Sequence, residues 1–226
     1  MSDTHFKQLI LFDLDNTLLS GDSDFAWAQF LIERGILDRE LYQAQNEVFM
    51  KAYENGTLDI SAFLEFQLKP LARHARRELN AWREEFMQKK IKPMIGSKPQ
   101  ALIRSHQTPN KLAVIITATN RFITEPIAAE LGVPHLIATD PEERDGEFTG
   151  NVVGIPCFRE GKVQRLDEWL SAHGTRLGEL ETWFYSDSLN DLALLERVDH
   201  PIAVDPDTAL SSVAHARGWP VISLRD

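Results

Sequence analysis

The chain has 226 residues, of which 43% are hydrophobic, so it is long enough for one large domain or for one domain with a smaller one inserted. Its formal net charge of −10 argues against a nucleic-acid binder, which normally carries a basic face. The single cysteine excludes an intrachain disulfide, residues 1–5 are unlike the start of a signal peptide, and no apolar run is long enough to cross a membrane, so we expect a soluble cytoplasmic protein.

The first predicted element is a strand over residues 7–13. Its four consecutive apolar residues, from Leu9 to Phe12, are typical of a strand buried on both faces of a sheet. The strand runs directly into Asp13 and Asp15, and a buried carboxylate without a partner is costly in free energy. We therefore expect both aspartates at the end of the strand, where a metal ion and a lysine meet them.

The residues that follow Leu19 carry helical patterns and no strand pattern. Helices are predicted over residues 24–34 and 39–54, from residue 60 onward, and within residues 73–90. Asp38 and Asp59 are suited to cap two of these helices at their N-termini, and Gly56 separates the two. We predict that residues 20–95 form a small α-helical cap domain inserted after the first strand.

From Gly96 onward, predicted helices alternate with predicted strands. The strands cover residues 111–117, 135–139, 183–187, 201–204 and 221–224, and the helices cover residues 97–105, 122–131, 162–172, 191–197 and 206–216. Ser97 and Asp205 are predicted to cap two of these helices. Asp145-Gly146 is predicted to turn a hairpin.

This alternation indicates an α/β fold with a Rossmann-like, mostly parallel sheet. We assign residues 1–19 and 96–226 to this core domain. In such sheets, ligands bind at the carboxyl ends of the strands. Three predicted strands end there in polar side chains, namely Asp13, Thr117 and Asp187, so we expect these side chains to surround a ligand.

Four short motifs occur in order along the core domain. They are Asp13-Leu14-Asp15-Asn16-Thr17-Leu18, Ile115-Ile116-Thr117, Gly161-Lys162 and Tyr185-Ser186-Asp187-Ser188-Leu189-Asn190-Asp191. Together they resemble the four motifs of the haloacid dehalogenase-like (HAD) phosphohydrolases. The helical insert between the first and second motifs resembles the phosphoserine-phosphatase-like branch of that superfamily.

The resemblance implies a Mg²⁺-dependent phosphomonoesterase that works through an aspartyl-phosphate intermediate. It implies that Asp13 is the nucleophile, and that Asp15 first protonates the leaving alcohol and then activates water. Thr117 and Lys162 would hold the phosphoryl oxygens. Asp13, Asp187 and the backbone carbonyl of Asp15 would bind the metal ion.

The balance of charge supports this metal assignment. The site combines several carboxylates with a single lysine, so a dianionic phosphate ester needs further positive charge there. Mg²⁺ is suited to supply it, because this ion prefers hard oxygen ligands from a few carboxylates and a phosphate. The resemblance further implies that Asn190 and Asp191 support the site by orienting Lys162 or a metal-bound water.

Further residues are candidates for contact with the substrate. Asp22 lies nine positions after the nucleophile, where phosphoserine phosphatases place an acidic residue that meets the substrate amine. The N-cap of the first helix of the insert fits Asp22 and Asp24 equally well. Thr119 and Asn120 follow the second motif, and Thr119 competes with Thr117 for contact with the phosphate.

The residues around the motifs also depart from those of phosphoserine phosphatases. Larger residues replace small glycine-rich ones after the second motif, and Ser186 and Ser188 stand where glycines are usual in the fourth. These departures disfavour phosphoserine and are consistent with a small amino-bearing monoester without a carboxylate, such as histidinol phosphate. We expect such a phosphomonoester as the partner, neither nucleic acid nor membrane, and a monomer or homodimer.

Other functions share part of this pattern. A phosphotransferase or phosphomutase has all four motifs but protects the aspartyl-phosphate from water. A receiver domain also gathers aspartates, a hydroxyl and a lysine on a parallel sheet, but it lacks an acid spaced like Asp15 and has no helical insert. A non-catalytic protein that binds a phospho-ligand is expected to have lost a motif residue, and none is lost here.

Overall fold

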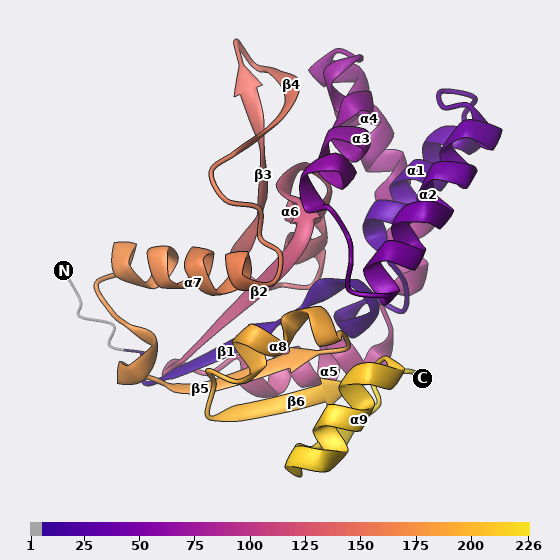
Figure 1. Cartoon of the computed structure of the whole chain (residues 1–226). Helices are drawn as coiled ribbons and strands as arrows, with labels where there is room; N and C mark the ends of the chain where they lie inside the picture. Colours follow the sequence, from indigo (N-terminus) through magenta and orange to yellow (C-terminus); the bar gives the residue numbers. More distant parts are fainter. Residues whose placement is uncertain (1–5) are drawn as a thin grey trace.

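Figure 1 shows the computed structural model of the chain, which describes residues 6–226. Residues 1–5, on which the prediction about a signal peptide rested, lie outside the described residues. The strands are β1 (Gln8–Phe12), β2 (Lys111–Asn120), β3 (His135–Arg144), β4 (Glu147–Val153), β5 (Glu181–Ser186), β6 (His200–Val204) and β7 (Val221–Ile222). They form one sheet in the order β4-β3-β2-β1-β5-β6-β7, in which only β3 and β4 are antiparallel neighbours. The predicted α/β fold with a mostly parallel sheet is confirmed.

Strand β1 lies in the middle of the sheet and is buried on both faces, as its apolar run predicts. Ile10 and Phe12 belong to one hydrophobic cluster, and Leu9 and Leu11 belong to another. This division follows from strand geometry, because successive side chains point to opposite faces of a sheet. Burial of large apolar side chains, at about 1.5–3 kcal/mol each, fixes β1 between the two layers of helices.

The register of the central strands brings the predicted site residues to one edge of the sheet. Phe12 pairs with Ile115 on β2 and with Tyr185 on β5. The backbone N–H of Asp13 donates to the carbonyl of Tyr185 at 2.9 Å. The carboxyl ends of these strands therefore lie side by side, and Asp13 and Asp187 come close together at that edge of the sheet.

The helices of the insert follow β1 before the chain returns to the sheet. They are α1 (Ser23–Glu33), α2 (Arg39–Glu54), α3 (Ile60–Ala72) and α4 (Arg76–Phe86). The later helices are α5 (Ser97–His106), α6 (Arg121–Glu130), α7 (Glu160–Ala172), α8 (Leu192–Leu195) and α9 (Thr208–Arg217). We propose that residues 20–95, which contain helices and no strand, are a cap domain on a core of residues 1–19 and 96–226.

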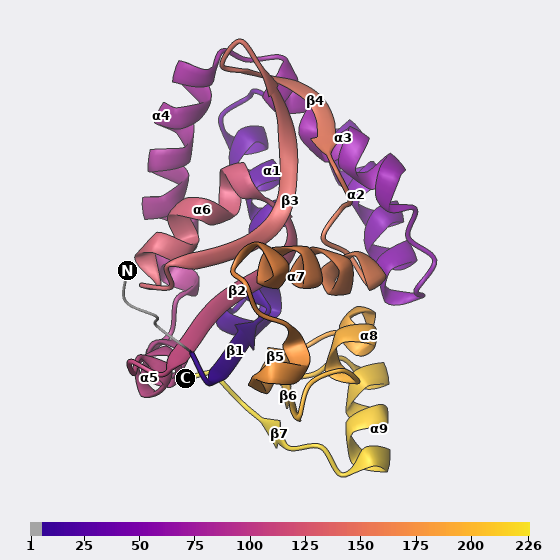
Figure 2. The ribbon, with the colours of Figure 1, turned by 90° about the vertical axis from the view of Figure 1, so that its left-hand side faces the viewer.

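The cap helices and the core share one hydrophobic cluster. The ring of Trp27 on α1 packs edge-on against Phe86 on α4 and against Phe122 on α6, with centroids 5.1 Å and 5.9 Å apart. Figure 2 shows α1 and α4 standing beside α6 at the same end of the molecule. The cap is thus seated on the core by buried aromatic rings.

A hairpin of the core also supports the cap. Asp145-Gly146 forms its predicted turn between β3 and β4, and the hairpin rises from the sheet to reach α3 (Figure 2). The backbone N–H of Arg76 donates to the Glu147 carboxylate at 2.7 Å, and its guanidinium carbon lies 4.1 Å from the centroid of the Phe148 ring. The sequence predicts the hairpin but not this contact with the cap.

The starts of the first three helices of the insert depend on local sequence. Asp38 and Asp59 cap α2 and α3, each accepting backbone N–H donors from the first turn. Asp22, and not Asp24, caps α1 by accepting from the N–H of Phe25 at 2.8 Å. This settles the choice between the two aspartates for that cap.

Two predicted N-caps are wrong. Ser97 lies inside α5, and its N–H donates to the carboxylate of Asp226 at 2.7 Å, so the cap comes from the other end of the chain. Asp207, rather than Asp205, caps α9 by accepting from the N–H of Leu210 at 2.6 Å. Only the first outcome is invisible in the local pattern, because a distant carboxylate takes the role, whereas at α9 the aspartate directly before the helix takes it.

Several elements differ in extent from the predictions. Strand β2 continues past residue 117 to Asn120, and β3 continues past residue 139 to Arg144. The helix predicted over residues 191–197 is shorter, because a 3-10 turn at Leu189–Asp191 precedes α8. Tertiary contacts decide these ends, since β3 is extended by its pairing with β4.

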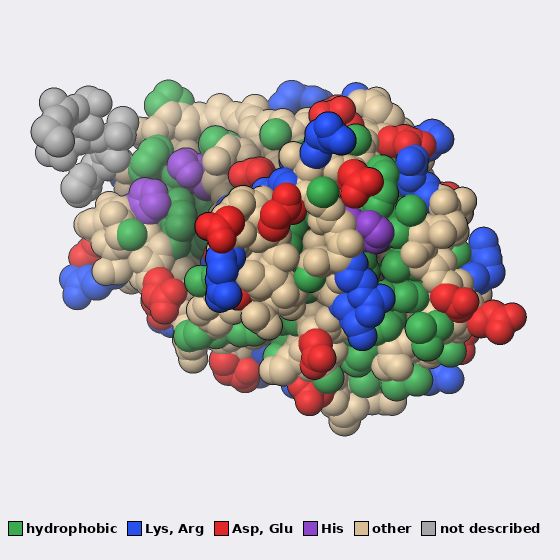
Figure 3. All heavy atoms as spheres, turned by 90° about the horizontal axis from the view of Figure 1, so that it is seen from above, with side chains coloured by type: hydrophobic (Ala, Val, Ile, Leu, Met, Phe, Trp, Pro, Cys, Tyr) green, Lys and Arg blue, Asp and Glu red, His purple; other side chains and the backbone are tan. Residues whose placement is uncertain are grey.

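None of the helices within residues 6–226 has both the length and the apolar character that a membrane crossing requires. Figure 3 views the molecule from the end that carries the cap and the hairpin tip. On this face, acidic and basic side chains are interspersed, with hydrophobic side chains among them.

Candidate active site

Asp13 and Lys162 form a buried ion pair at the end of β1. Lys162 lies in the first turn of α7, and its Nζ donates to Asp13 Oδ1 at 2.7 Å and to Asp191 Oδ2 at 2.8 Å. The two partners of the pair are 7% and 3% exposed. Burial lowers the pKa of Lys162, but Asp13 and Asp191 outweigh it and raise the pKa above its usual value, so the ammonium stays charged.

A glycine before Lys162 allows this approach. A Cβ at Gly161 would lie 2.1 Å from the carbonyl oxygen of Pro156, which no side chain tolerates. The start of α7 therefore packs against the preceding loop more closely than any other residue permits. The structure thus explains both residues of the Gly161-Lys162 motif: the glycine allows the close packing, and the lysine pairs with Asp13.

Thr17 joins the first motif to the fourth. Its Oγ1 lies 3.2 Å from Asp13 Oδ2 and 3.0 Å from Asp187 Oδ1, and it accepts from the N–H of Asp187 at 3.0 Å. One hydroxyl proton cannot serve two carboxylates at once. Thr17 therefore fixes the positions of Asp13 and Asp187 without balancing their charge.

The surplus negative charge on Asp187 bears on metal binding. Burial raises the pKa of Asp187 well above its usual value, and repulsion by Asp13 and Asp191 raises it further. Within residues 6–226 no basic side chain forms an ion pair with Asp187. Two neighbouring carboxylates that lack enough positive charge fit a divalent cation.

The remaining metal ligand predicted from the resemblance is a backbone carbonyl, that of Asp15. The described part of the chain holds no group of three His, Cys, Asp or Glu side chains arranged to bind a metal, so the predicted set of ligands stays a prediction. A site of two carboxylates and a carbonyl leaves positions for water and phosphate. Such a donor set suits Mg²⁺, which keeps several waters when protein binds it.

Asp15 is held by the cap and by the end of β2, and Asn16 turns the chain directly after it with a φ of 56°. Asp15 Oδ1 accepts from the N–H of Ser23 at 2.7 Å, and Oδ2 accepts from Thr119 Oγ1 at 2.8 Å. Burial, with repulsion from Asp22, raises the pKa of Asp15 to about 6. A carboxyl group with such a pKa is suited to carry a proton near neutral pH.

The structure separates the three candidates around the second motif. Thr117 lines the cavity and accepts from the N–H of Thr119 at 3.2 Å. Thr119 also lines it, but its hydroxyl donates to Asp15. Asn120 is not among the residues that line the cavity, and its side chain instead accepts from the N–H of Ile123 at 3.3 Å at the start of α6. Of these three residues, Thr117 is therefore the one whose hydroxyl remains available to donate to a phosphate.

The fourth motif supports Lys162 and contacts the cap. Ser186 Oγ donates to Asp191 Oδ2 at 2.7 Å, so Asp191 is held from both sides. Ser188 Oγ accepts from the hydroxyl of Tyr53 on α2 at 2.9 Å. The two serines that replace the usual glycines therefore both form hydrogen bonds at the site.

A second contact between core and cap lies beside the first. Arg159 donates through Nε to Asn190 Oδ1 at 2.9 Å and through Nη2 to the carbonyl of Gly56 at 2.6 Å. We call the bonds Tyr53–Ser188 and Arg159–Gly56 the cap latch. They fasten the end of α2 and the loop after it to the loop of the fourth motif and to the residue that precedes α7.

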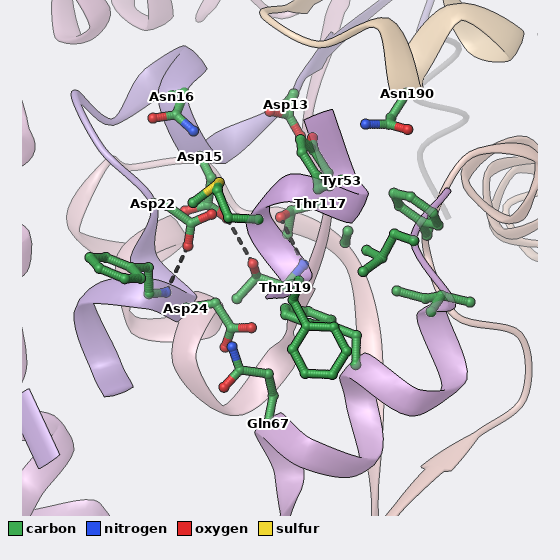
Figure 4. Close-up of a pocket in the computed structure, with 18 of the residues that line it drawn as sticks. Asp13, Asp15, Asn16, Asp22, Asp24, Tyr53, Gln67, Thr117, Thr119 and Asn190 are labelled. Atoms are coloured by element: carbon green, nitrogen blue, oxygen red, sulfur yellow. Dashed lines mark hydrogen bonds between the residues drawn. The ribbon is translucent and has the colours of Figure 1, made fainter. Parts of the chain in front are cut away.

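A cavity lies between the core residues and the cap, and Figure 4 shows it. Asp13, Thr117 and Lys162 line its core side. Its cap side is mostly aromatic and aliphatic, formed by Phe25, Phe49, Met50, Tyr53, Leu58, Ile60 and Phe63. Four polar side chains also line it on the cap side, namely Asp22, Asp24, Asn46 and Gln67.

Charge is unevenly distributed in this cavity. Lys162 is the only basic side chain among the described residues that line it, and Asp13 and Asp191 already bind its ammonium. Burial raises the pKa values of Asp22 and Asp24. The part of the cavity that faces the cap is lined by carboxyl groups and apolar side chains, and no basic side chain of residues 6–226 lines it there.

The sequence predictions missed several residues that shape the site. The sequence motif could have indicated Thr17, because this residue belongs to the first motif. No sequence pattern indicates Tyr53, Asn46 or Gln67 beyond their places on predicted helices, since their roles depend on how the cap helices pack. Asp24 was considered for the N-cap of α1, and the structure places it in the cavity instead.

Known proteins resemble this chain over nearly its whole length. A family model for haloacid dehalogenase-like hydrolases matches residues 10–196. A histidinol-phosphatase of Neisseria meningitidis serogroup C (strain 8013) is 45% identical over 221 residues, which cover 97% of this chain and 100% of that protein. A crystal structure from Bordetella pertussis Tohama I, of a protein with unknown function, has a TM-score of 0.92 and 47% identity, and covers 97% of this chain and 100% of that one. A substrate-bound phosphoserine phosphatase shares the fold, with a TM-score of 0.68 at 19% identity over 97% of this chain and 93% of its own.

Proposed function

This chain belongs to the haloacid dehalogenase-like hydrolase family and is a phosphatase, and from that premise we propose that its substrate is histidinol phosphate or a close analogue. The charge pattern of the cavity carries this proposal. Asp22 and Asp24 line the cap side, and no basic side chain other than the bonded Lys162 lines the cavity within residues 6–226. An amino-bearing leaving group without a carboxylate matches that pattern.

Phosphoserine fits this cavity less well. Its carboxylate would enter a space lined by Asp22 and Asp24, and a buried carboxylate without a cationic partner is costly in free energy. Histidinol phosphate carries the same ammonium as phosphoserine, and a group with an imidazole ring takes the place of that carboxylate. The name and 45% identity of the relative from Neisseria meningitidis support the same choice.

The reaction begins with the attack of an Asp13 carboxylate oxygen on phosphorus. The bond from phosphorus to the ester oxygen breaks, and the proton of Asp15 passes to the departing alcohol. Asp15 then takes a proton from the water that attacks the aspartyl-phosphate, which releases phosphate and restores Asp13. Lys162 and Thr117 hold the phosphoryl oxygens, and Thr119 holds Asp15 in place through its 2.8 Å hydrogen bond.

We assign Mg²⁺ to Asp13, Asp187 and the backbone carbonyl of Asp15. When bound there, the ion supplies positive charge to the phosphate and offsets the repulsion among the carboxylates. Thr17 holds the two carboxylates together through contacts of 3.2 Å and 3.0 Å. These contacts keep Asp13 and Asp187 in place for the ion.

Phosphate release from a small panel of esters tests the proposal. Histidinol phosphate, phosphoserine and ethanolamine phosphate are each assayed with Mg²⁺ and with excess EDTA. We expect the highest kcat/KM for histidinol phosphate, and EDTA should abolish turnover of all three. A higher kcat/KM for phosphoserine would refute the proposed substrate.

The same assay separates hydrolysis from transfer. A primary alcohol is added at high concentration, and both free phosphate and the new ester are measured. We expect free phosphate to account for the ester consumed, because Asp15 lies beside the leaving group and can activate water there. Product that appears mainly as the new ester would identify a phosphotransferase.

A further inference from the structure

Asp24 is a buried carboxylate that lines the cavity. It lies in the first turn of α1, is 6% exposed, and forms no side-chain hydrogen bond or ion pair with any of residues 6–226. Figure 4 shows its carboxylate directed toward the amide of Gln67 on α3. Burial, with repulsion from Asp22 and Asp15, raises the pKa of Asp24 well above its usual value. Asp22 differs from it, because Asp22 caps α1.

Asn46 is a second polar group in the same cavity without a partner. It is 7% exposed, and its Nδ2 is a buried donor that binds nothing within the described part of the chain. A buried donor left without an acceptor is costly in free energy. Two such groups of opposite hydrogen-bonding character, one acceptor and one donor, therefore line this cavity.

The wall near these polar groups is aromatic. Phe49 and Phe63 both line the cavity, and their rings pack edge to face with centroids 5.3 Å apart. Flat aromatic surfaces favour a flat ligand, because stacked and edge-on ring contacts each add to the free energy of burial. A ring fits this wall better than a flexible chain does.

Resting on the proposed function, we propose that Asp24 and Asn46, with Gln67 beside them, recognise a nitrogen heteroaromatic ring of the leaving group. A ring N–H donates to the Asp24 carboxylate, and an unprotonated ring nitrogen accepts from Asn46 Nδ2. The amide of Gln67 can donate or accept beside them. An imidazole has both kinds of nitrogen in one ring, so Asp24 determines specificity for such a ring.

Kinetics on a matched pair of substrates test this inference. Histidinol phosphate has an amine and an imidazole ring, whereas ethanolamine phosphate has the amine and no ring. Asp24→Asn and Asn46→Leu should each lower kcat/KM for histidinol phosphate about 10- to 100-fold, because the first removes the negative charge that strengthens the bond from the ring N–H and the second removes the donor to the other ring nitrogen. Each should change kcat/KM for ethanolamine phosphate less than about 3-fold.

Controls separate recognition from folding. Asp38→Asn changes an aspartate that caps α2 outside the cavity, so it should leave both substrates unaffected. Thermal unfolding of every variant checks that the cap is intact. Competitive inhibition by histidinol, the dephosphorylated product, should weaken in Asp24→Asn by about the same factor as kcat/KM falls.

The possible failures differ from one another. If the wild-type protein prefers histidinol phosphate and Asp24→Asn keeps that preference, the ring site is refuted and the proposed function stands. Equal losses on both substrates in a folded variant would also refute the ring site, because they indicate a structural role. If the wild-type protein itself turns over both esters equally well, the proposed substrate and the ring site fail together.

Discussion

At the scale of single residues, two aspartates that are separated by one residue take different roles because their partners differ. Asp13 meets Lys162, whereas Asp15 meets Ser23 and Thr119, and Asn16 turns the chain directly after Asp15 with a φ of 56°. Asn is one of the few residues that adopt this conformation at small cost. A β-branched residue at position 16 would strain the turn.

Replacement of the nucleophile tests the role of Asp13. Asp13→Asn should lower phosphate release by at least about 1,000-fold, because an amide does not attack phosphorus. Lys162 keeps its bond to Asp191, so the melting temperature should change by only a few degrees. Phosphate release and thermal unfolding measure both effects. Turnover close to wild type would refute the mechanism.

Asp24 should also affect stability as a function of pH. Its pKa in the folded protein is raised, so above its ordinary value of 3.8 the native state binds more protons than the unfolded state. Stability from this group therefore falls as pH rises, by about 1.4 kcal/mol for each unit of pKa shift. Asp24→Asn removes this pH-dependent loss of stability. The free energy of unfolding, measured in urea, should therefore increase in the variant relative to wild type from pH 5 to pH 8. Parallel pH curves would contradict this.

The two kinds of site residue differ in how far sequence predicts them. Asp13, Lys162 and Asp191 belong to motifs and meet as predicted, because each follows a strand or begins a helix at one edge of the sheet. Asp24 and Asn46 belong to no motif. They enter the cavity because helices α1 and α2 pack around it, and helical periodicity does not specify that packing.

At the scale of elements, the cap latch couples α2 to the loop of the fourth motif. Tyr53→Phe removes one latch bond, so we expect kcat/KM to fall about 5-fold, the equivalent of about 1 kcal/mol. Tyr42→Phe is the matched control, because Tyr42 also lies on α2 but packs on Phe66 away from the cavity. Steady-state kinetics of both variants measure kcat/KM. Wild-type kinetics in Tyr53→Phe would show that this latch bond does not contribute to catalysis.

Elements show the same limit of prediction as residues. The starts of α2 and α3 follow from Asp38 and Asp59, which lie one position before the helices they cap. The start of α5 depends on Asp226, which is far away in sequence, so no local pattern indicates it. The hairpin turn at Asp145-Gly146 is local and predictable, whereas the packing of β4 on α3 is not.

At the scale of the whole molecule, Arg225, near the end of the described chain, contacts the turn that follows Asp13 and Asp15. Arg225 donates through Nη1 to the carbonyl of Thr17 at 3.2 Å and through Nη2 to the carbonyl of Asn16. Arg225→Ala should lower kcat about 10-fold with little change in KM, because it loosens the turn that positions Asp13. Arg217→Ala, which removes a surface pair with Glu196, should leave kcat unchanged. A rise in KM alone would contradict a positioning role for Arg225.

The acidic lining of the cavity also acts before a substrate arrives. The chain carries a formal charge of −10, and its field repels anions over a screening length of about 8 Å at physiological ionic strength. Phosphoserine carries about one more negative charge than histidinol phosphate, so it meets the protein less often. Added salt should therefore speed the capture of phosphoserine more than that of histidinol phosphate. Selection between the two esters then begins in the encounter rate, and it weakens as the ionic strength rises.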